Sequence, residues 1–252
     1  MLHGLAPGVA IIDITHDVPA HDVRSGGLTL VRAAQYLPDG CVVLAVVDPG
    51  VGTDRRLLAV DCDHATFLGP DNGLLAPAVA LLGGARHVVS LTNADRQLPA
   101  PGPTFAGRDV LAPAAAHLAL GNPIDDLGAP VDPASLVPGL VPLPTPLDGG
   151  ALEAHVWWVD HFGNVQLNVG PDELRAAGAE PGATIEVSSG EWAKAARWVD
   201  TYADARPSEL VLLIDSYGLV SLALDRRSAA AEYGLQPGTV VVLAPPGATV
   251  EP

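Results

Sequence analysis

The chain has 252 residues, of which 48% are apolar and 17% are charged, and its formal net charge is −16 at pH 7. Proteins that bind the phosphate backbone of nucleic acids need clustered lysine and arginine, so this charge argues against a nucleic-acid partner. Apolar runs are shorter than the roughly 18 residues of a membrane-spanning helix, and no basic segment of the secretory type opens the sequence. We therefore expect a cytoplasmic protein with no membrane partner, whose two cysteines are buried thiols.

The first half of the chain alternates between aliphatic runs and segments with apolar residues at helical spacing. The aliphatic runs are near-continuous, as in strands that are buried on both faces, and lie at residues 8–15, 41–48 and 57–62. The helical segments lie at residues 22–38, 72–84 and 108–122. Because strands and helices alternate, we predict an N-terminal α/β domain over residues 1–128 with a largely parallel central sheet.

The pattern changes after residue 128. Residues 129–150 are rich in proline and glycine and have no periodicity, so we predict an interdomain linker there. Short apolar runs follow and predict strands, which lie at residues 152–160, 163–169, 184–189, 209–216, 219–225 and 239–245. We therefore predict a smaller, β-rich C-terminal domain over residues 151–252.

Residues 46–56, with the sequence VVDPGVGTDRR, combine the end of a buried strand with a tight turn and charged side chains. Asp48 stands where the predicted strand ends, the place at which open α/β sheets form their sites. A proline and two glycines then allow a sharp turn, after which Arg55 or Arg56 can fold back toward Asp48. A guanidinium there favours the ionised carboxylate, which suits an orienting acceptor better than a general base. An ion pair that only braces the turn fits the same residues, and the motif alone leaves both interpretations open.

Other turns carry polar and aromatic side chains in both halves of the chain. In FLGPDNGLL, Asp71 and Asn72 fit the cap of the helix that follows. In VDHFGNVQLN, Asp160, Phe162 and Asn164 form a combination that can stack on an aromatic base and hydrogen-bond to its edge. Taken singly, each of these clusters also fits an ordinary turn.

The sequence contains no motif that is typical of a metal site or of a nucleoside-triphosphate site. A metal site needs His, Cys, Asp or Glu ligands at converging spacings, and the histidines and cysteines here match no such pattern. There is also no P-loop, no GxSxG, no GxGxxG and no HExxH motif. The sequence therefore argues against a metallohydrolase, an NTPase and a serine esterase, and we predict no metal ion.

Six motifs in this order resemble the S-adenosyl-L-methionine (SAM) hydroxide adenosyltransferases. These are SAM hydrolases that form adenosine, and they share a superfamily with the fluorinase and the chlorinase. The motifs are IIDITHDVPAHDV, VVDPGVGTDRR, LGPDNGLL, TFAGRDVLAPAAAHLA, VDHFGNVQLN and DSYGLVSLAL, within a resemblance that runs over roughly residues 4–240. It implies an N-terminal α/β domain, a C-terminal β-barrel-like domain, and a homotrimer that binds substrate between the N-terminal domain of one subunit and the C-terminal domain of the next. It implies no cofactor, because SAM is the substrate.

The resemblance also implies roles for individual residues. Asp48 and Arg55 match two members of the catalytic Asp–Arg–His set that handles the attacking water, whereas the halogenases have tyrosine at the Asp48 position. The implied substrate contacts are Phe105 and Gly107 around the ribose C5′, Asp160 at the methionine ammonium, Ser216 and Tyr217 at the methionine carboxylate, Asn164 and the backbone near Asp225 and Arg226 at the adenine edge, and Tyr202 on the adenine face. Phe162, between Asp160 and Asn164, is the further aromatic that we expect to contact the base.

The match departs from the family at Ala106. Relatives read Phe-His-Gly-Arg-Asp where this chain reads Phe-Ala-Gly-Arg-Asp, so the third member of the catalytic set is missing. That loss costs about 10²- to 10⁴-fold in rate if the histidine acts as a general base. Our first hypothesis is a hydrolase, impaired by Ala106, that cleaves SAM at C5′ with water or hydroxide to give adenosine and L-methionine. The alternatives are a non-catalytic protein that binds adenosine or SAM and a SAM-dependent halogenase, against which Asp48 counts.

Overall fold

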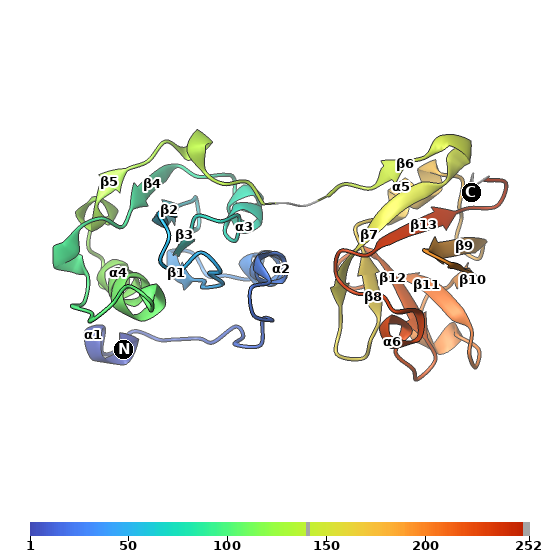
Figure 1. The fold of residues 1–252 in the computed structure, drawn as a ribbon, viewed down its shortest axis with the longest axis horizontal. Coiled ribbons are helices and arrows are strands. Elements are labelled where there is room, and N and C mark those ends of the chain that lie inside the picture. The colour runs from blue at the N-terminus through green and yellow to red at the C-terminus, as the bar shows by residue number, and fades with distance from the viewer. Residues whose placement is uncertain (140–141, 249–252) are drawn as a thin grey trace. The chain divides into compact units, whose positions relative to one another are not determined.

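The computed structural model describes residues 1–139 and 142–248 and divides into two compact units, residues 1–141 and 142–252. Each unit has its own sheet and its own apolar core, so each is described by itself (Figure 1). The division falls inside the stretch that the sequence predicts as a linker. Both ends of that stretch are structured, because Ala129–Pro130 forms strand β5 of the first sheet and Thr145–Pro146 forms strand β6 of the second.

The sheet of the first unit has the strand order β1-β3-β2-β4-β5. Its longer strands are β1 (Cys41–Leu44), β2 (Leu57–Asp61), β3 (Ala65–Pro70) and β4 (His87–Ser90). The predicted α/β class is confirmed, but the prediction of a largely parallel sheet is wrong. Among the pairs that the described residues form in this sheet, only β1 and β3 are parallel, and the other three pairs are antiparallel. Residues 62–64 alone join β2 to β3, which is too short for the crossover that parallel neighbours need.

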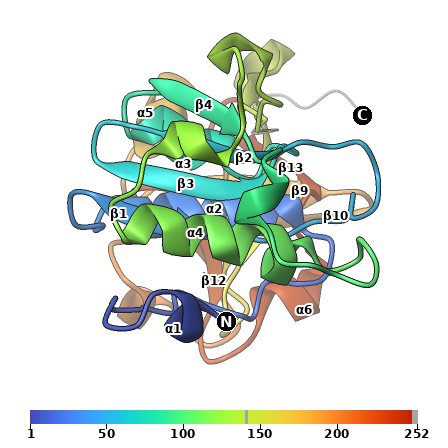
Figure 2. The same cartoon turned by 90° about the vertical axis from the view of Figure 1, so that its left-hand side faces the viewer.

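Helices cover both faces of this sheet, which explains the near-continuous aliphatic runs. The helices are α1 (Leu2–Leu5), α2 (Val23–Ala34), α3 (Ala76–Leu81) and α4 (Ala112–Ala119), with a π-turn at Gly107–Leu111 ahead of α4. Leu58 and Val60 of β2 belong to the core under α2 and α3, whereas Ala59 belongs to the core under α4. Figure 2 shows α4 in front of the sheet and α2 behind it.

The predicted strand at residues 8–15 is not formed. No strand of the described residues pairs with this segment, and Ile12 is 82% exposed. An aliphatic run becomes a strand only where a neighbouring backbone completes its hydrogen bonds, and β1 pairs only with β3 among the described residues. The aliphatic character of this segment was therefore not sufficient to predict its structure.

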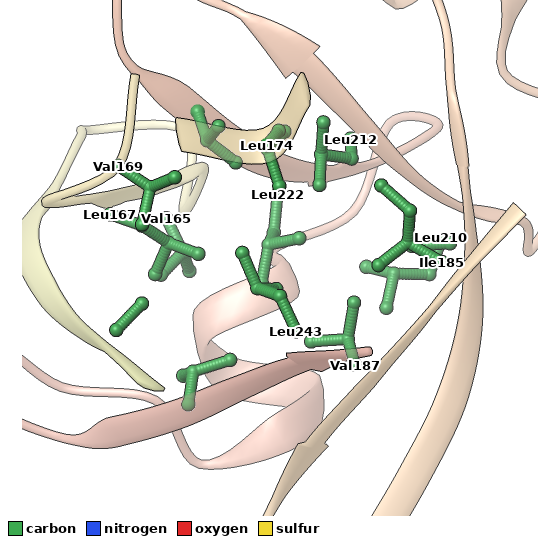
Figure 3. Close-up of a cluster of buried hydrophobic side chains, with 14 of the residues drawn as sticks. Val165, Leu167, Val169, Leu174, Ile185, Val187, Leu210, Leu212, Leu222 and Leu243 are labelled. Atoms are coloured by element: carbon green, nitrogen blue, oxygen red, sulfur yellow. The ribbon is translucent and has the colours of Figure 1, made fainter. Parts of the chain in front are cut away.

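The second unit is a closed barrel, which confirms the β-barrel-like prediction. Its strands run in the order β13-β9-β10-β11-β12-β8-β7-β6, and the pairing of β13 with β7 closes it. The bounds are β7 (Leu152–Val159), β8 (Val165–Leu167), β9 (Thr184–Ser189), β10 (Trp192–Trp198), β11 (Leu210–Ile214), β12 (Val220–Leu224) and β13 (Val240–Ala244), with helices α5 (Pro171–Ala176) and α6 (Ala229–Tyr233). Figure 3 shows the aliphatic side chains of these strands converging inside the barrel.

Single-turn 3₁₀ helices connect the larger elements. They lie at Ala94–Arg96, Ile124–Leu127, Pro133–Ser135, Asp148–Gly150 and Tyr202–Asp204. Both cysteines are free, and burial raises the pKa of the Cys62 thiol to about 11. Among the described residues, no helix has the length and apolar character that crossing a membrane requires.

Candidate active site

Asp48 and Arg55 form a buried ion pair just beyond the end of β1. The Asp48 side chain is only 3% exposed and that of Arg55 is 15% exposed. Nε of Arg55 donates to Oδ1 and Oδ2 of Asp48 at 2.8 and 2.9 Å, and Nη2 donates to Oδ2 at 2.5 Å. The turn between them is closed by Thr53, whose hydroxyl donates to the carbonyl of Gly50 at 2.7 Å. The planar guanidinium of Arg55 therefore fixes the orientation of the Asp48 carboxylate beyond the end of β1.

Arg56 has a different partner, which settles the alternative that the sequence leaves open. Its Nε and Nη2 donate to Oδ2 of Asp71 at 2.8 and 2.5 Å, and Nη2 also reaches the carbonyl of Ser135. Asp71 receives the backbone N–H of Val137 on its other oxygen at 2.9 Å. Asp71 thus anchors the segment that leaves the first unit and does not cap α3.

Asn72 holds the strand end that carries Asp48. Its Nδ2 donates to the carbonyl of Val47 at 2.9 Å, while its Oδ1 accepts the backbone N–H of Leu74 at 3.1 Å. The sequence predicts a helix cap at this position, yet α3 starts without a side-chain cap bond. The link to Val47 spans 25 positions of the chain, so no local pattern signals it.

The turn before α4 packs against the same strand end. A Cβ placed on Gly107 would lie 3.6 Å from Cγ1 of Val46, which brings the π-turn against the strand end. Phe105 is 56% exposed, and the guanidinium of Arg108 lies 4.8 Å from the centre of its ring. Hydrogen bonds from Arg108 hold the pKa of the Asp109 carboxyl below its usual value.

A cavity of about 470 Å³ opens beside the ion pair. Arg55, Ala106 and Asp109 all line it, together with Leu57 and Gln97. Ala106 itself ends in a methyl group, so it offers the cavity no group that could accept a proton. The first unit thus brings together Asp48, Arg55, Ala106 and Gly107, and it leaves Phe105 at the surface.

In the second unit, Asp160 organises the loop between β7 and β8. Its Oδ1 accepts the backbone N–H groups of Phe162 and Asn164 at 2.9 and 2.8 Å, and its Oδ2 accepts Nδ2 of Asn164 at 2.8 Å. A carboxylate has about four acceptor positions, so these three bonds leave one on Oδ2 for a ligand. The ring of Phe162 is 77% exposed.

A second aspartate organises the turn that carries Ser216 and Tyr217. Oδ1 of Asp215 accepts the backbone N–H groups of Tyr217 and Leu219, and its Oδ2 accepts Nε2 of Gln166 on β8 at 2.5 Å. No local sequence pattern signals the contact between Asp215 and Gln166, because it joins the turn after β11 to β8, 49 positions apart in the chain.

Tyr202 lies near both aspartate-held loops. Burial raises the pKa of its phenol, the negative charges of Asp160 and Asp215 raise it further, and a hydrogen bond with Ser221 opposes them. Ser221 is buried and stands opposite Gln166 in the pairing of β12 with β8. The phenol of Tyr202 therefore remains protonated near neutral pH and belongs to the same cluster as the two loops.

Asp225 and Arg226 form the next turn, after β12. Arg226 adopts a positive φ of 53°, and its side chain is 93% exposed, 3.8 Å from Asp225. The following Ser228 caps α6 and touches Gly163, where a Cβ would lie only 2.7 Å from Cα of Ser228. This contact places the 225–228 turn beside the loop of Asp160.

The predicted residues thus gather in two clusters, one in each unit. The first holds Asp48, Arg55, Phe105 and Gly107, and the second holds Asp160, Phe162, Asn164, Tyr202, Ser216, Tyr217, Asp225 and Arg226. Within the described residues, no group of three or more His, Cys, Asp and Glu side chains is placed to hold a metal ion.

Comparison with known proteins places both units in one family of sequences. Residues 1–128 match the model of the SAM hydroxide adenosyltransferase N-terminal domain, and residues 154–242 match that of the C-terminal domain. The chain is 44% identical to an (R)-S-adenosyl-L-methionine hydrolase of Salinispora tropica over 94% of its own length and 87% of the relative. It is 28% identical to a fluorinase of an Actinoplanes species, over 96% and 90% of the two chains. Among solved structures, an uncharacterized conserved protein from Thermotoga maritima matches with a TM-score of 0.86 at 28% identity, over 96% and 92% of the two chains.

Proposed function

The chain belongs to the SAM hydroxide adenosyltransferase family, and from that premise we propose that it hydrolyses SAM to adenosine and L-methionine. The carrying observation is the buried Asp48, gripped by Arg55 beside a cavity that Ala106 also lines. Water or hydroxide attacks C5′ of the ribose in line with the sulfonium. The new C5′–O bond forms as the C5′–S bond breaks, and the electron pair of that bond goes to sulfur.

Asp48 acts as the acceptor that orients the nucleophile. Sulfur leaves as a neutral thioether, so the reaction needs no general acid. Arg55 takes up both carboxylate oxygens and so fixes the direction in which Asp48 accepts a hydrogen bond from water. Holding the water in line with the scissile bond lowers the entropic part of the barrier. When water is the nucleophile, its proton passes to solvent water after the C5′–O bond has formed.

The cluster of the second unit provides groups for the rest of the substrate. The open acceptor position on Asp160 suits the methionine ammonium, and Ser216 and Tyr217, on the turn that Asp215 holds, suit the methionine carboxylate. Phe162 and Tyr202 offer aromatic faces for adenine, and Asn164 with the 225–226 backbone suits the adenine edge. In this proposal the chain is a homotrimer in which each substrate touches two subunits, it acts in the cytoplasm, and it needs no cofactor.

Ala106 keeps a second candidate function in view, a protein that binds SAM or adenosine without turnover. Its support is that Ala106 contributes a methyl group, and no proton acceptor, to the lining of the cavity. The fluorinase likeness brings a third candidate, a halogenase, which the aspartate at position 48 disfavours.

One assay separates these candidates. The purified chain is incubated with SAM, and adenosine and methionine are followed by chromatography against a protein-free control. Equal amounts of both products support hydrolysis, whereas binding of SAM without adenosine supports the non-catalytic candidate. A halo-adenosine that forms only when chloride or bromide is added supports the halogenase.

A further inference from the structure

Gln166 is a buried amide that faces away from the barrel core. Its neighbours Val165 and Leu167 point into that core (Figure 3), so the alternation of a strand turns Gln166 outward. It is nevertheless only 4% exposed. Its amide donates to Asp215, which lies in the turn after β11.

The bond from Gln166 completes the hydrogen bonding of the turn at 215–219. Asp215 uses one oxygen to hold the N–H groups of Tyr217 and Leu219, and Gln166 occupies the other at 2.5 Å. The turn is thereby tied to β8 through a neutral donor. A carboxylate at position 166 would repel Asp215, and an apolar side chain would leave one oxygen of Asp215 without this donor.

The same strand position joins the other parts of the cluster. Asn164, two residues earlier, holds Asp160, and Ser221, opposite Gln166 on β12, bonds to Tyr202. Gln166 therefore stands where the two aspartate-held loops meet the aromatic residue.

We propose that Gln166 is a positioning residue that sets the turn of Ser216 and Tyr217 for the methionine end of the substrate. This inference rests on the proposed function and adds a residue that touches no substrate atom. Its loss weakens binding at the methionine end and leaves the adenine end unchanged, because the loop that presents Phe162 and Asn164 to adenine keeps its own hydrogen bonds to Asp160.

The test measures binding of L-methionine and of adenosine separately, by calorimetry on the full chain, with turnover of SAM as a parallel readout. Gln166→Leu and Gln166→Glu should raise the Kd of L-methionine about tenfold or more at pH 7.5, the worth of a hydrogen bond to a charged group. The Kd of adenosine should change by less than about twofold. In turnover, KM for SAM rises more than kcat falls.

Gln166→Glu adds a readout that a purely structural role would not move. Two carboxyls that share a site have one raised pKa, so a shared proton restores the bond at low pH and is lost as pH rises. The affinity of this variant for methionine, relative to that of the wild type, should therefore fall as pH rises. Asp160 and Tyr202 face the same cluster in wild type and variant, so the comparison between the two isolates the effect of the carboxyl at position 166. The double variant Gln166→Glu/Asp215→Asn exchanges the amide and the carboxylate between the two positions. This exchange should recover the affinity for methionine and remove its pH dependence.

Asn168 supplies the matched control. It lies two positions beyond Gln166 and is buried to 5% exposure, but it bonds to the N–H of His155 and the carbonyl of Pro142. Asn168→Asp should leave the Kd of methionine unchanged. Equal losses for methionine and adenosine, no loss for methionine, or no rescue by the exchange would overturn the proposal, as would a wild type that binds no methionine. A wild type that binds methionine but forms no adenosine refutes the proposed function and leaves this test readable.

Discussion

Replacing Asp48 by asparagine removes one charge and keeps the shape of the side chain. Asparagine keeps one of the two oxygens at which Arg55 now directs its hydrogen bonds, and its NH₂ group replaces the other and cannot accept from Arg55. Breaking a buried ion pair by removing one partner costs about 3–5 kcal/mol. Arg55 is 15% exposed and keeps one acceptor, so we expect the lower end, about 3 kcal/mol, of the free energy of unfolding.

The effect on catalysis is a separate quantity. A hydrogen bond between water and a charged acceptor contributes about 1.5–3 kcal/mol. If that bond is made to the nucleophile in the transition state, its loss lowers kcat roughly 10- to 150-fold. KM for SAM should change little, because in the proposed function the methionine and adenine contacts lie in the second unit.

Asp71→Asn is the matched control, because Nε and Nη2 of the neighbouring Arg56 likewise donate to the Asp71 carboxylate, both to its Oδ2. Urea denaturation should show a loss of stability in both variants, and chromatographic assays at 25 °C, corrected for the folded fraction, should show a loss of kcat only in Asp48→Asn. If Asp48→Asn keeps more than half of the wild-type kcat, or if Asp71→Asn loses as much, then Asp48 braces the turn and does not handle the nucleophile.

Three further predictions concern other parts of the chain. Ala106→His places an imidazole in the wall of the 470 Å³ cavity that Arg55 lines. If the site lacks a proton acceptor, kcat should rise by about 10²- to 10⁴-fold. A kcat equal to that of the wild type between pH 6 and 8, about the range over which imidazole titrates, argues against that account. Gly163→Ala puts a Cβ on a residue with φ of +82° and drives it into Ser228, so thermal unfolding should show a loss above about 1 kcal/mol, whereas Gly190→Ala, at φ of +58° with open space around it, should lose less. Hydrogen bonds from Arg197 and from the Arg206 backbone hold the pKa of Glu209 at about 2, below its usual 4.5, so their stabilisation is complete above about pH 4.5 and is lost as pH falls toward 2. Glu209→Gln should therefore be less stable than wild type at neutral pH and lose less stability on acidification, and parallel pH curves from urea titrations would contradict this.

The sequence predicts what depends on local pattern and misses what depends on pairing. The helices at α2 and α4 and the series of strands after residue 150 follow from periodicity alone. The direction of β2 relative to β3 does not, because an aliphatic run signals burial on both faces without signalling orientation. Residues 8–15 show the same limit, since their composition suits a strand that finds no partner among the described residues.

In the candidate site too, local contacts can be predicted from the sequence and long-range contacts cannot. The pairing of Asp48 with an arginine is predictable, because the turn residues between them bring the chain back on itself. The sequence does not predict that the partner is Arg55 and not Arg56, because this depends on the ion pair that Arg56 forms with Asp71, just after β3. Gln166 and Asp215 escape the motif analysis because each looks like an ordinary strand or turn residue until β8 and the 215–219 turn are brought together.

The most direct test of the central claim is hydrolysis of SAM in water enriched in ¹⁸O. Attack of water at the ribose C5′ predicts that the adenosine formed by the purified chain carries one labelled oxygen, at its 5′-hydroxyl, and that the methionine released with it carries none. Adenosine without the label, or no adenosine above the protein-free control, would contradict the account.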